Sequence, residues 1–210
     1  RDLHSFPTRR SSDLKIAVNR GLLTELNSEA ELAAVLGHEI VHAAARHGAK
    51  GMERGILLQG AVVITGIAAR GSNYENLAVR GSQTAAGLIN QKYGRNAESE
   101  SDLYGMKYMS RAGFDPRAAI SLQEVFVRLS EGQETDWLSG LFSSHPPSQQ
   151  RVEANRVTAK TLPESGELGV QRYKDKIARL IQTKDDYHAF DMGRKALSEE
   201  IGRASCRERV

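Results

Sequence analysis

Residues 33–42 read Ala-Ala-Val-Leu-Gly-His-Glu-Ile-Val-His, and the expected fold is organised around this run. The spacing of four residues between His38 and His42 places both imidazoles on one face of a helix, close enough to bind one cation. Glu39 lies about 100° around the helix axis from His38. A carboxylate beside the ligands is placed to act as a general base on a water bound to the cation. The run therefore predicts a helix that carries two metal ligands and a base.

A third ligand is expected in residues 96–102, which read Asn-Ala-Glu-Ser-Glu-Ser-Asp. A catalytic zinc ion takes three protein ligands and keeps one position open for water. Glu98 and Asp102 are four residues apart on one helical face, so Glu98 is expected to bind the metal while Asp102 accepts the N–H of a ligating imidazole and fixes its tautomer. Alone, this segment would equally suit the solvated acidic first turn of a helix. Together with the first motif it predicts one Zn2+ per chain.

His145 is a further candidate for the site, because Ser143-Ser144-His145-Pro146-Pro147 places it in a rigid, non-helical step before a helix. Such a step can aim an imidazole into a cleft, but His-Pro dipeptides are also common loop material, which is the better account of this segment taken alone. Two roles are open for it. As a hydrogen-bond donor to the developing oxyanion it would speed hydrolysis. As a fourth metal ligand it would displace the water and hold the enzyme latent, and this latch is the role we favour.

The remaining histidines are assigned no part in the site. His47 lies five residues after His42, on another helical face, and is expected to be a cation near a helix C-terminus. His188 lies in a polar helix and is expected at the surface.

Periodicity predicts a mostly helical α+β fold. Lys15–Asn19 alternates weakly and is the expected strand. Ser28 and Glu31 have the spacing of a capping box at the start of the motif helix, and Pro116 and Pro146 are each expected in the first turn of a helix. Helices are expected at residues 29–48, 51–68, 76–91, 96–111, 116–131, 146–160, 169–182 and 185–198.

Gly55–Ala69 is the most apolar stretch of the chain. It is about 15 residues long, whereas a membrane-spanning helix needs about 20. We expect either a buried helix or a segment that covers the active site or contacts a membrane surface. Gly71–Asn76, which follows, is an expected bend.

Both ends of the chain are predicted to be foreign to the protein. A single DNA string, translated as it stands and as its reverse complement, gives residues 4–13 and residues 201–210. The string resembles a sequencing-library adapter, and such segments are excluded from fold reasoning. Without residues 1–14 and 201–210 the formal net charge falls from +3 to 0, so a basic balance gives no reason to expect a nucleic-acid partner. Cys206 is removed as well, which leaves no disulfide or cysteine ligand.

The arrangement of motifs resembles one family of gluzincin zinc proteases, that of the CAAX prenyl protease and HtpX. The likeness is greatest for its periplasmic branch, the β-barrel assembly-enhancing protease and its relatives. It spans about residues 15–160 and departs from the usual pattern at Ser101, where an alanine is common. The matching segments are Asn19–Leu23, Ala33–Glu39, Ala45–His47, Arg111–Pro116 and Ser144–Pro146.

This resemblance implies the roles of the site residues. His38, His42 and Glu98 would be the ligands, Glu39 the base and Asp102 the partner of a ligating histidine. On the substrate side it implies His145 and Arg151, and an edge strand, Lys15–Leu22 with Asn19 in it, along which an extended substrate would pair.

The resemblance also implies an organisation of the chain. Residues 15–165 would be an N-terminally truncated zincin-type peptidase domain. Residues 166–200 would be a helical tail, in which Tyr187–Glu200 starts a tetratricopeptide repeat.

The expected function is that of a zinc metalloendopeptidase that hydrolyses unfolded or misassembled envelope proteins with a metal-activated water. The expected location is the bacterial periplasm or its membrane surface, with the outer-membrane assembly machinery as a partner. One alternative is an envelope chaperone or scaffold with a latched or structural zinc site, although such a site needs no base at Glu39. Another is a membrane-embedded protease of the same family.

Overall fold

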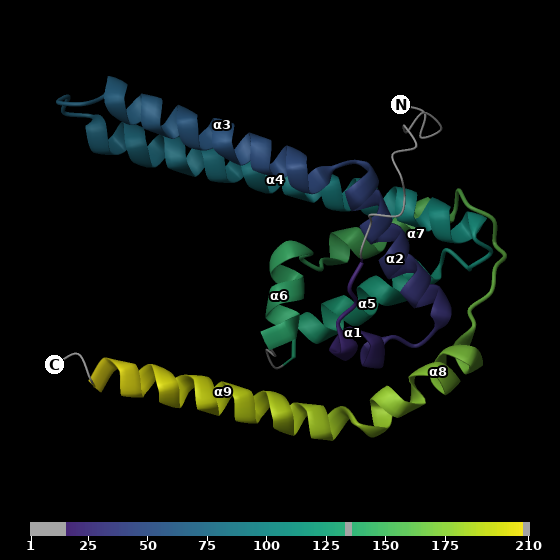
Figure 1. Cartoon of the computed structure of the whole chain (residues 1–210). Coiled ribbons are helices and arrows are strands. Elements are labelled where there is room, and N and C mark those ends of the chain that lie inside the picture. The colour runs from purple at the N-terminus through teal and green to yellow at the C-terminus, as the bar shows by residue number, and fades with distance from the viewer. Residues whose placement is uncertain (1–15, 133–135, 208–210) are drawn as a thin grey trace.

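The computed structural model describes residues 16–132 and 136–207, and these form a helical fold (Figure 1). The helices are α1 (Arg20–Glu25), α2 (Glu29–Ala44), α3 (His47–Ala68), α4 (Glu75–Arg111), α5 (Ala118–Ser130), α6 (Asp136–Ser144), α7 (Gln149–Ala159), α8 (Val170–Gln182) and α9 (Lys184–Arg207).

The centre of the fold is the contact between α2 and the C-terminal half of α4. Gly37 on α2 faces Gly105 on α4, and a β-carbon on Gly37 would lie 2.8 Å from the carbonyl oxygen of Gly105. The two helix backbones can approach this closely only because both residues lack a side chain. Because His38 follows Gly37 and Asp102 lies one turn before Gly105, the contact fixes the distance between the two predicted motifs.

A single hydrophobic core surrounds this contact. Helices α5 and α7 pack against the α2–α4 pair, and α8 packs against α1 and α2. The largest fully buried apolar side chains are those of Met106, Met109 and Val152. The core thus joins residues of α2 and α4, which carry the ligands, to a larger number from α1, α5 and α8.

The start of α2 confirms the capping box. The hydroxyl of Ser28 accepts the backbone N–H of Glu31 at 3.1 Å, and the Glu31 carboxylate accepts the N–H of Asn27 at 2.6 Å. The helix ends at Ala44, earlier than expected, because Arg46 adopts a left-handed conformation with φ of 56° and turns the chain into α3.

Helices α3 and α4 form a long hairpin that projects from the rest of the molecule (Figure 1). The segments 76–91 and 96–111, expected as separate helices, belong to one continuous helix, α4. The residue between them that disfavours a helix, Gly94, costs only about 1 kcal/mol relative to alanine. Packing against α3 offsets a cost of that size.

The expected strand is wrong. Residues 16–19 are not assigned to a strand, residue 15 lies outside the described residues, and Arg20–Leu22 belong to α1. A strand requires a neighbour for its backbone N–H and C=O groups. Across residues 16–132 and 136–207 the β-type pairing is limited to an isolated bridge between Phe114 and Glu167. Asn19 instead caps α1, accepting the N–H of Gly21 at 2.7 Å.

Both proline predictions are wrong by about one turn. Helix α5 begins at Ala118 and α7 at Gln149, so Pro116 and Pro146 precede their helices. Ser148 is the N-cap of α7 and accepts the N–H of Arg151 at 3.2 Å. The capping preference of serine therefore outweighs the preference of proline for the first turn.

The C-terminal segment has two parts. Tyr173 and Ile177 of α8 belong to the common core, and the Tyr173 hydroxyl donates to the carbonyl oxygen of Leu23 at 2.7 Å. Helix α9 leaves Phe190 and Met192 more than half exposed. The domain boundary at residue 165, the repeat and the adapter interpretation stay predictions, and residues 1–14 lie outside the described residues. None of the helices in the described part of the chain is long and apolar enough to cross a membrane.

Candidate metal centre

Four side chains from three parts of the chain converge on one point. His38 and His42 come from α2, Glu98 from α4, and His145 from the step between α6 and α7. One nitrogen or oxygen atom from each lies within 4.8 Å of the others. The site residues predicted as ligands are thus brought together, with His145 added to them.

The separations between these atoms fit a small tetrahedral cation. The Nε2 atoms of His38 and His42 are 3.0 Å apart, and the Nδ1 atom of His145 lies 3.4 Å from Nε2 of His38. Glu98 oxygens lie 3.0 Å from His42, 3.3 Å from His38 and 3.2 Å from His145. Ligands about 2.0–2.1 Å from a tetrahedral zinc ion are about 3.3 Å apart. Two motif imidazoles, a carboxylate and a third imidazole are also a donor set that zinc accepts.

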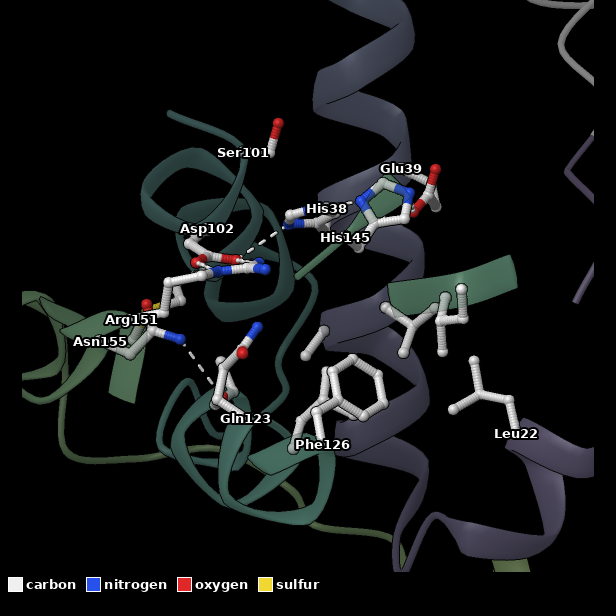
Figure 2. A pocket seen from close by; sticks show the side chains of 16 residues that line it. Leu22, His38, Glu39, Ser101, Asp102, Gln123, Phe126, His145, Arg151 and Asn155 are labelled. Atoms are coloured by element: carbon white, nitrogen blue, oxygen red, sulfur yellow. Dashed lines mark hydrogen bonds and ion pairs between the residues drawn. The ribbon is translucent and has the colours of Figure 1, made fainter. Parts of the chain in front are cut away.

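Asp102 lies behind the ligands, where the sequence predicts it. Its Oδ1 atom accepts the Nδ1–H of His38 at 2.9 Å, so the opposite nitrogen of that ring faces the cluster (Figure 2). Arg151 binds the same carboxylate from the other side, with its Nε and Nη2 atoms each 2.7 Å from Asp102 oxygens. The Nη1 atom of Arg151 also lies 3.1 Å from Glu98.

Arg151 is therefore placed differently from the substrate side that the resemblance implies. Its side chain is buried, and its contacts are with Asp102, with Glu98 and with the carbonyl oxygen of Pro146 at 3.2 Å. It connects the two acidic residues of α4 to the loop that carries His145. A role toward substrate stays a prediction for Arg151 and for Asn19.

Electrostatics in the cluster favour a bound cation. Burial would lower the pKa of His38, but hydrogen bonds to Asp102 and Glu98 and their negative charges outweigh burial and raise that pKa to about 9. Burial would raise the pKa of Glu98, but hydrogen bonds from His145, His38 and His42 hold it far below its usual range. The Asp102 pKa is lowered in the same way, against burial, by Arg151 and His38. Both carboxylates are thus ionised at neutral pH, and their charge attracts positive charge to the His38 ring.

Glu39 stands beside the cluster and outside it. Its side chain is 33% exposed, and its Oε1 atom lies 3.6 Å from the Nε2 atom of His145. The same imidazole therefore faces the ligands with Nδ1 and the predicted base with Nε2 (Figure 2). The pocket next to His38 and Glu39 has a cavity volume of about 40 Å³, which is enough room for water.

His47 is a site residue that the sequence analysis missed. Its Nδ1 atom lies 3.1 Å from Nδ1 of His42, and its Nε2 atom lies 3.2 Å from a Glu100 oxygen. The ring thus links the second motif histidine to an acidic residue of α4. The missed signal is the helix break at Arg46, because on a continuous helix a residue five positions after His42 would point elsewhere.

Comparison with known proteins finds a family and several relatives. The model of peptidase family M48 matches residues 6–159. The chain is 31% identical over 138 residues to mitochondrial metalloendopeptidase OMA1 of Arabidopsis thaliana, covering 65% of this chain and 26% of that protein. It is 30% identical over 156 residues to the putative beta-barrel assembly-enhancing protease of Vibrio cholerae, covering 70% and 31%. It is 28% identical over 142 residues to metalloprotease YcaL of Escherichia coli, covering 66% and 52%. The chain therefore spans between about a quarter and about half of the length of these relatives.

Proposed function

Because the chain belongs to peptidase family M48, we propose that it is the catalytic part of a zinc metalloendopeptidase. The observation that carries this proposal is the convergence of His38, His42 and Glu98 within ligand distance of one another, with the carboxylate of Glu39 beside them. A site that only stabilises the fold has no use for a free carboxylate next to its ligands. A site that hydrolyses a peptide bond needs one.

Each residue then has one task. His38, His42 and Glu98 would hold the metal, and Asp102 would keep the His38 ring in the tautomer whose Nε2 atom binds it. These residues would hold a zinc ion whose Lewis acidity would polarise the substrate carbonyl and lower the pKa of water to near neutral. Glu39 would take that proton at its carboxylate and pass it to the nitrogen of the departing amine.

His145 would hold this site in a latent state. Its Nδ1 atom occupies the place of a fourth ligand, 3.2 Å from both oxygens of Glu98, while its Nε2 atom approaches Glu39. An imidazole in this place displaces the water and also engages the base. Activity would require the loop around Pro146 to move away, and Arg151 connects that loop to Asp102.

A scaffold or chaperone with a structural zinc site is the second candidate. The closed set of four ligands favours it, since structural zinc sites are four-coordinate with protein ligands alone. The two candidates differ in whether a change at Glu39 lowers the rate of peptide hydrolysis.

The substrates we propose are unfolded or misassembled proteins of a bacterial envelope, with the outer-membrane assembly machinery as a partner. The names of two relatives support a connection to β-barrel assembly: the putative beta-barrel assembly-enhancing protease of Vibrio cholerae and the beta-barrel assembly-enhancing protease of Escherichia coli. Other relatives are named mitochondrial metalloendopeptidases, so the location in the envelope rests on the two bacterial names and on the resemblance of motifs.

Glu39→Gln tests the proposed activity. The amide keeps the size of the side chain but cannot accept the proton, so hydrolysis of an unfolded protein should fall by about 100-fold or more, with zinc content unchanged. Glu53→Gln, the same change on the exposed outer surface of α3, is the matched control and should leave turnover as it is. Equal turnover in the Glu39 variant would reject the mechanism and leave the scaffold as the better account.

A further inference from the structure

The hairpin of α3 and α4, here called the arm (residues 47–95), exposes an apolar surface that no other described residues of the chain cover. Ile56, Val63 and Ile67 are 68%, 51% and 67% exposed. Their separations of seven and four residues place them along one face of α3. Val62, which is 8% exposed, marks the buried side of the helix, and Gly66 on α3 packs near Val79 of α4.

The second helix of the arm and its tip also expose large apolar side chains. Leu77 and Leu88 of α4 are 70% and 61% exposed, and they are eleven residues apart, which places them on one helical face. Tyr74, beside the turn that joins the helices, is 71% exposed. An apolar face with a tyrosine at its end is a pattern of helices that lie at a membrane–water boundary.

The charge of the chain is divided between the arm and the rest. Of the 29 Lys and Arg and 26 Asp and Glu in the sequence, the arm holds six basic and two acidic residues, a net charge of +4. The remainder of the chain is left with a net charge of −1. Lys50 and Arg54 lie near the root, and Arg70 and Arg80 lie toward the tip. The positive charge of the arm is thus spread from its root to its tip.

We propose that the arm docks on the surface of a lipid bilayer that contains anionic lipids, with the exposed face of α3 in the headgroup region. Apolar burial and attraction between the cations and acidic headgroups act together in such binding. A second copy of the chain would bring two arms of the same net charge together, which the charge opposes. An unfolded protein could bind the apolar face, but its binding would not require the net positive charge of the arm.

This docking would bring the metal centre to the membrane surface. Helix α4 is continuous from Glu75 at the tip to Glu98 in the ligand cluster, a length of about 35 Å at 1.5 Å per residue. Helix α3 starts five residues after the ligand His42. Both helices of the arm therefore lead directly to ligands, and a protein emerging at the bilayer surface would meet the site at the root of the arm.

Co-flotation of the whole chain with lipid vesicles tests the proposal. One set of vesicles is phosphatidylcholine alone, and the other contains about one quarter phosphatidylglycerol. We expect binding to the anionic vesicles that weakens as salt is added, and much weaker binding to the neutral ones. Because no peptide hydrolysis is measured, this result is independent of the proposed function.

Substitutions on the arm separate its two contributions. Changing Ile56, Val63 and Ile67 together to Gln should lower the partition coefficient on anionic vesicles by about ten-fold or more. Changing Arg70 and Arg80 to Gln should lower it by about five-fold for each cation, the equivalent of about 1 kcal/mol, on anionic vesicles alone.

Three exposed apolar residues outside the arm supply the control. Val157, Leu168 and Ile181 are 63%, 46% and 49% exposed, and their joint change to Gln should leave the partition coefficient as it is. All variants should keep the circular dichroism and zinc content of the parent. Equal binding to neutral and anionic vesicles, or unchanged binding of the Ile56, Val63 and Ile67 variant, would overturn the proposal. A third outcome would also overturn it. In that outcome the parent chain binds no vesicles but self-associates in sedimentation velocity, and the Ile56, Val63 and Ile67 variant loses the self-association.

Discussion

Asp102→Asn perturbs the metal centre while leaving every ligand in place. The carboxylate makes three short contacts, 2.9 Å to Nδ1 of His38 and 2.7 Å to each of two Arg151 nitrogens. An amide has one accepting oxygen, and its NH2 group would face a donor. The variant must therefore lose the contact with His38 or part of the contact with Arg151. Losing the partner of a ligating histidine typically lowers metal affinity about 10- to 100-fold, or by about 1.4–2.7 kcal/mol.

Zinc affinity is measured by competition with a chromophoric chelator, on protein whose circular dichroism shows that it is folded. The folding check matters because breaking a buried ion pair typically costs about 3–5 kcal/mol. Asp115→Asn is a matched control: Asp115 is also buried and paired with an arginine, Arg117, but it lies outside the ligand cluster. If Asp102→Asn binds zinc as tightly as the parent does, Asp102 does not position His38 and this part of the account fails.

Two further substitutions test the other histidines of the centre. His145→Ala should keep zinc and raise hydrolysis of an unfolded protein several-fold, because it frees both the fourth position and Glu39, whereas Ser144→Ala next to it should change nothing. Loss of turnover with zinc retained would instead make His145 the oxyanion donor. His47→Ala should lower zinc affinity about ten-fold, since His42 loses the partner at its Nδ1 atom, whereas His188→Ala on the exposed face of α9 should not. If the His47 variant matches the parent in chelator competition, its contact with His42 has no bearing on the metal.

The ligand cluster could be predicted because helical spacing is local. Residues four apart share a face wherever the helix lies, so the spacing alone pairs His38 with His42 and Glu98 with Asp102, whatever the tertiary contacts. That the two pairs face each other depends on the approach of Gly37 to Gly105. A lone glycine inside a helical pattern does not reveal which glycine it will meet.

The features that the sequence did not predict depend on the rest of the fold. His47 reaches His42 because Arg46 leaves the helical conformation for a left-handed one, which is strained for a non-glycine residue. The neighbouring sequence does not predict this change. Residues 16–19 have the pattern of a strand, but a strand forms only beside a partner. The placement of Arg151 behind the ligands follows from the capping of α7 by Ser148, which turns its first residues toward Asp102.

The zinc content of the purified chain bears most directly on a centre built from His38, His42 and Glu98. Elemental analysis after dialysis should find about one zinc per chain, removed by chelation and restored on adding the metal back. His42→Ala should lower the retained zinc to near zero, whereas His188→Ala should keep it. A parent chain without zinc after such loading, or a His42 variant that holds as much zinc as the parent, would contradict the account.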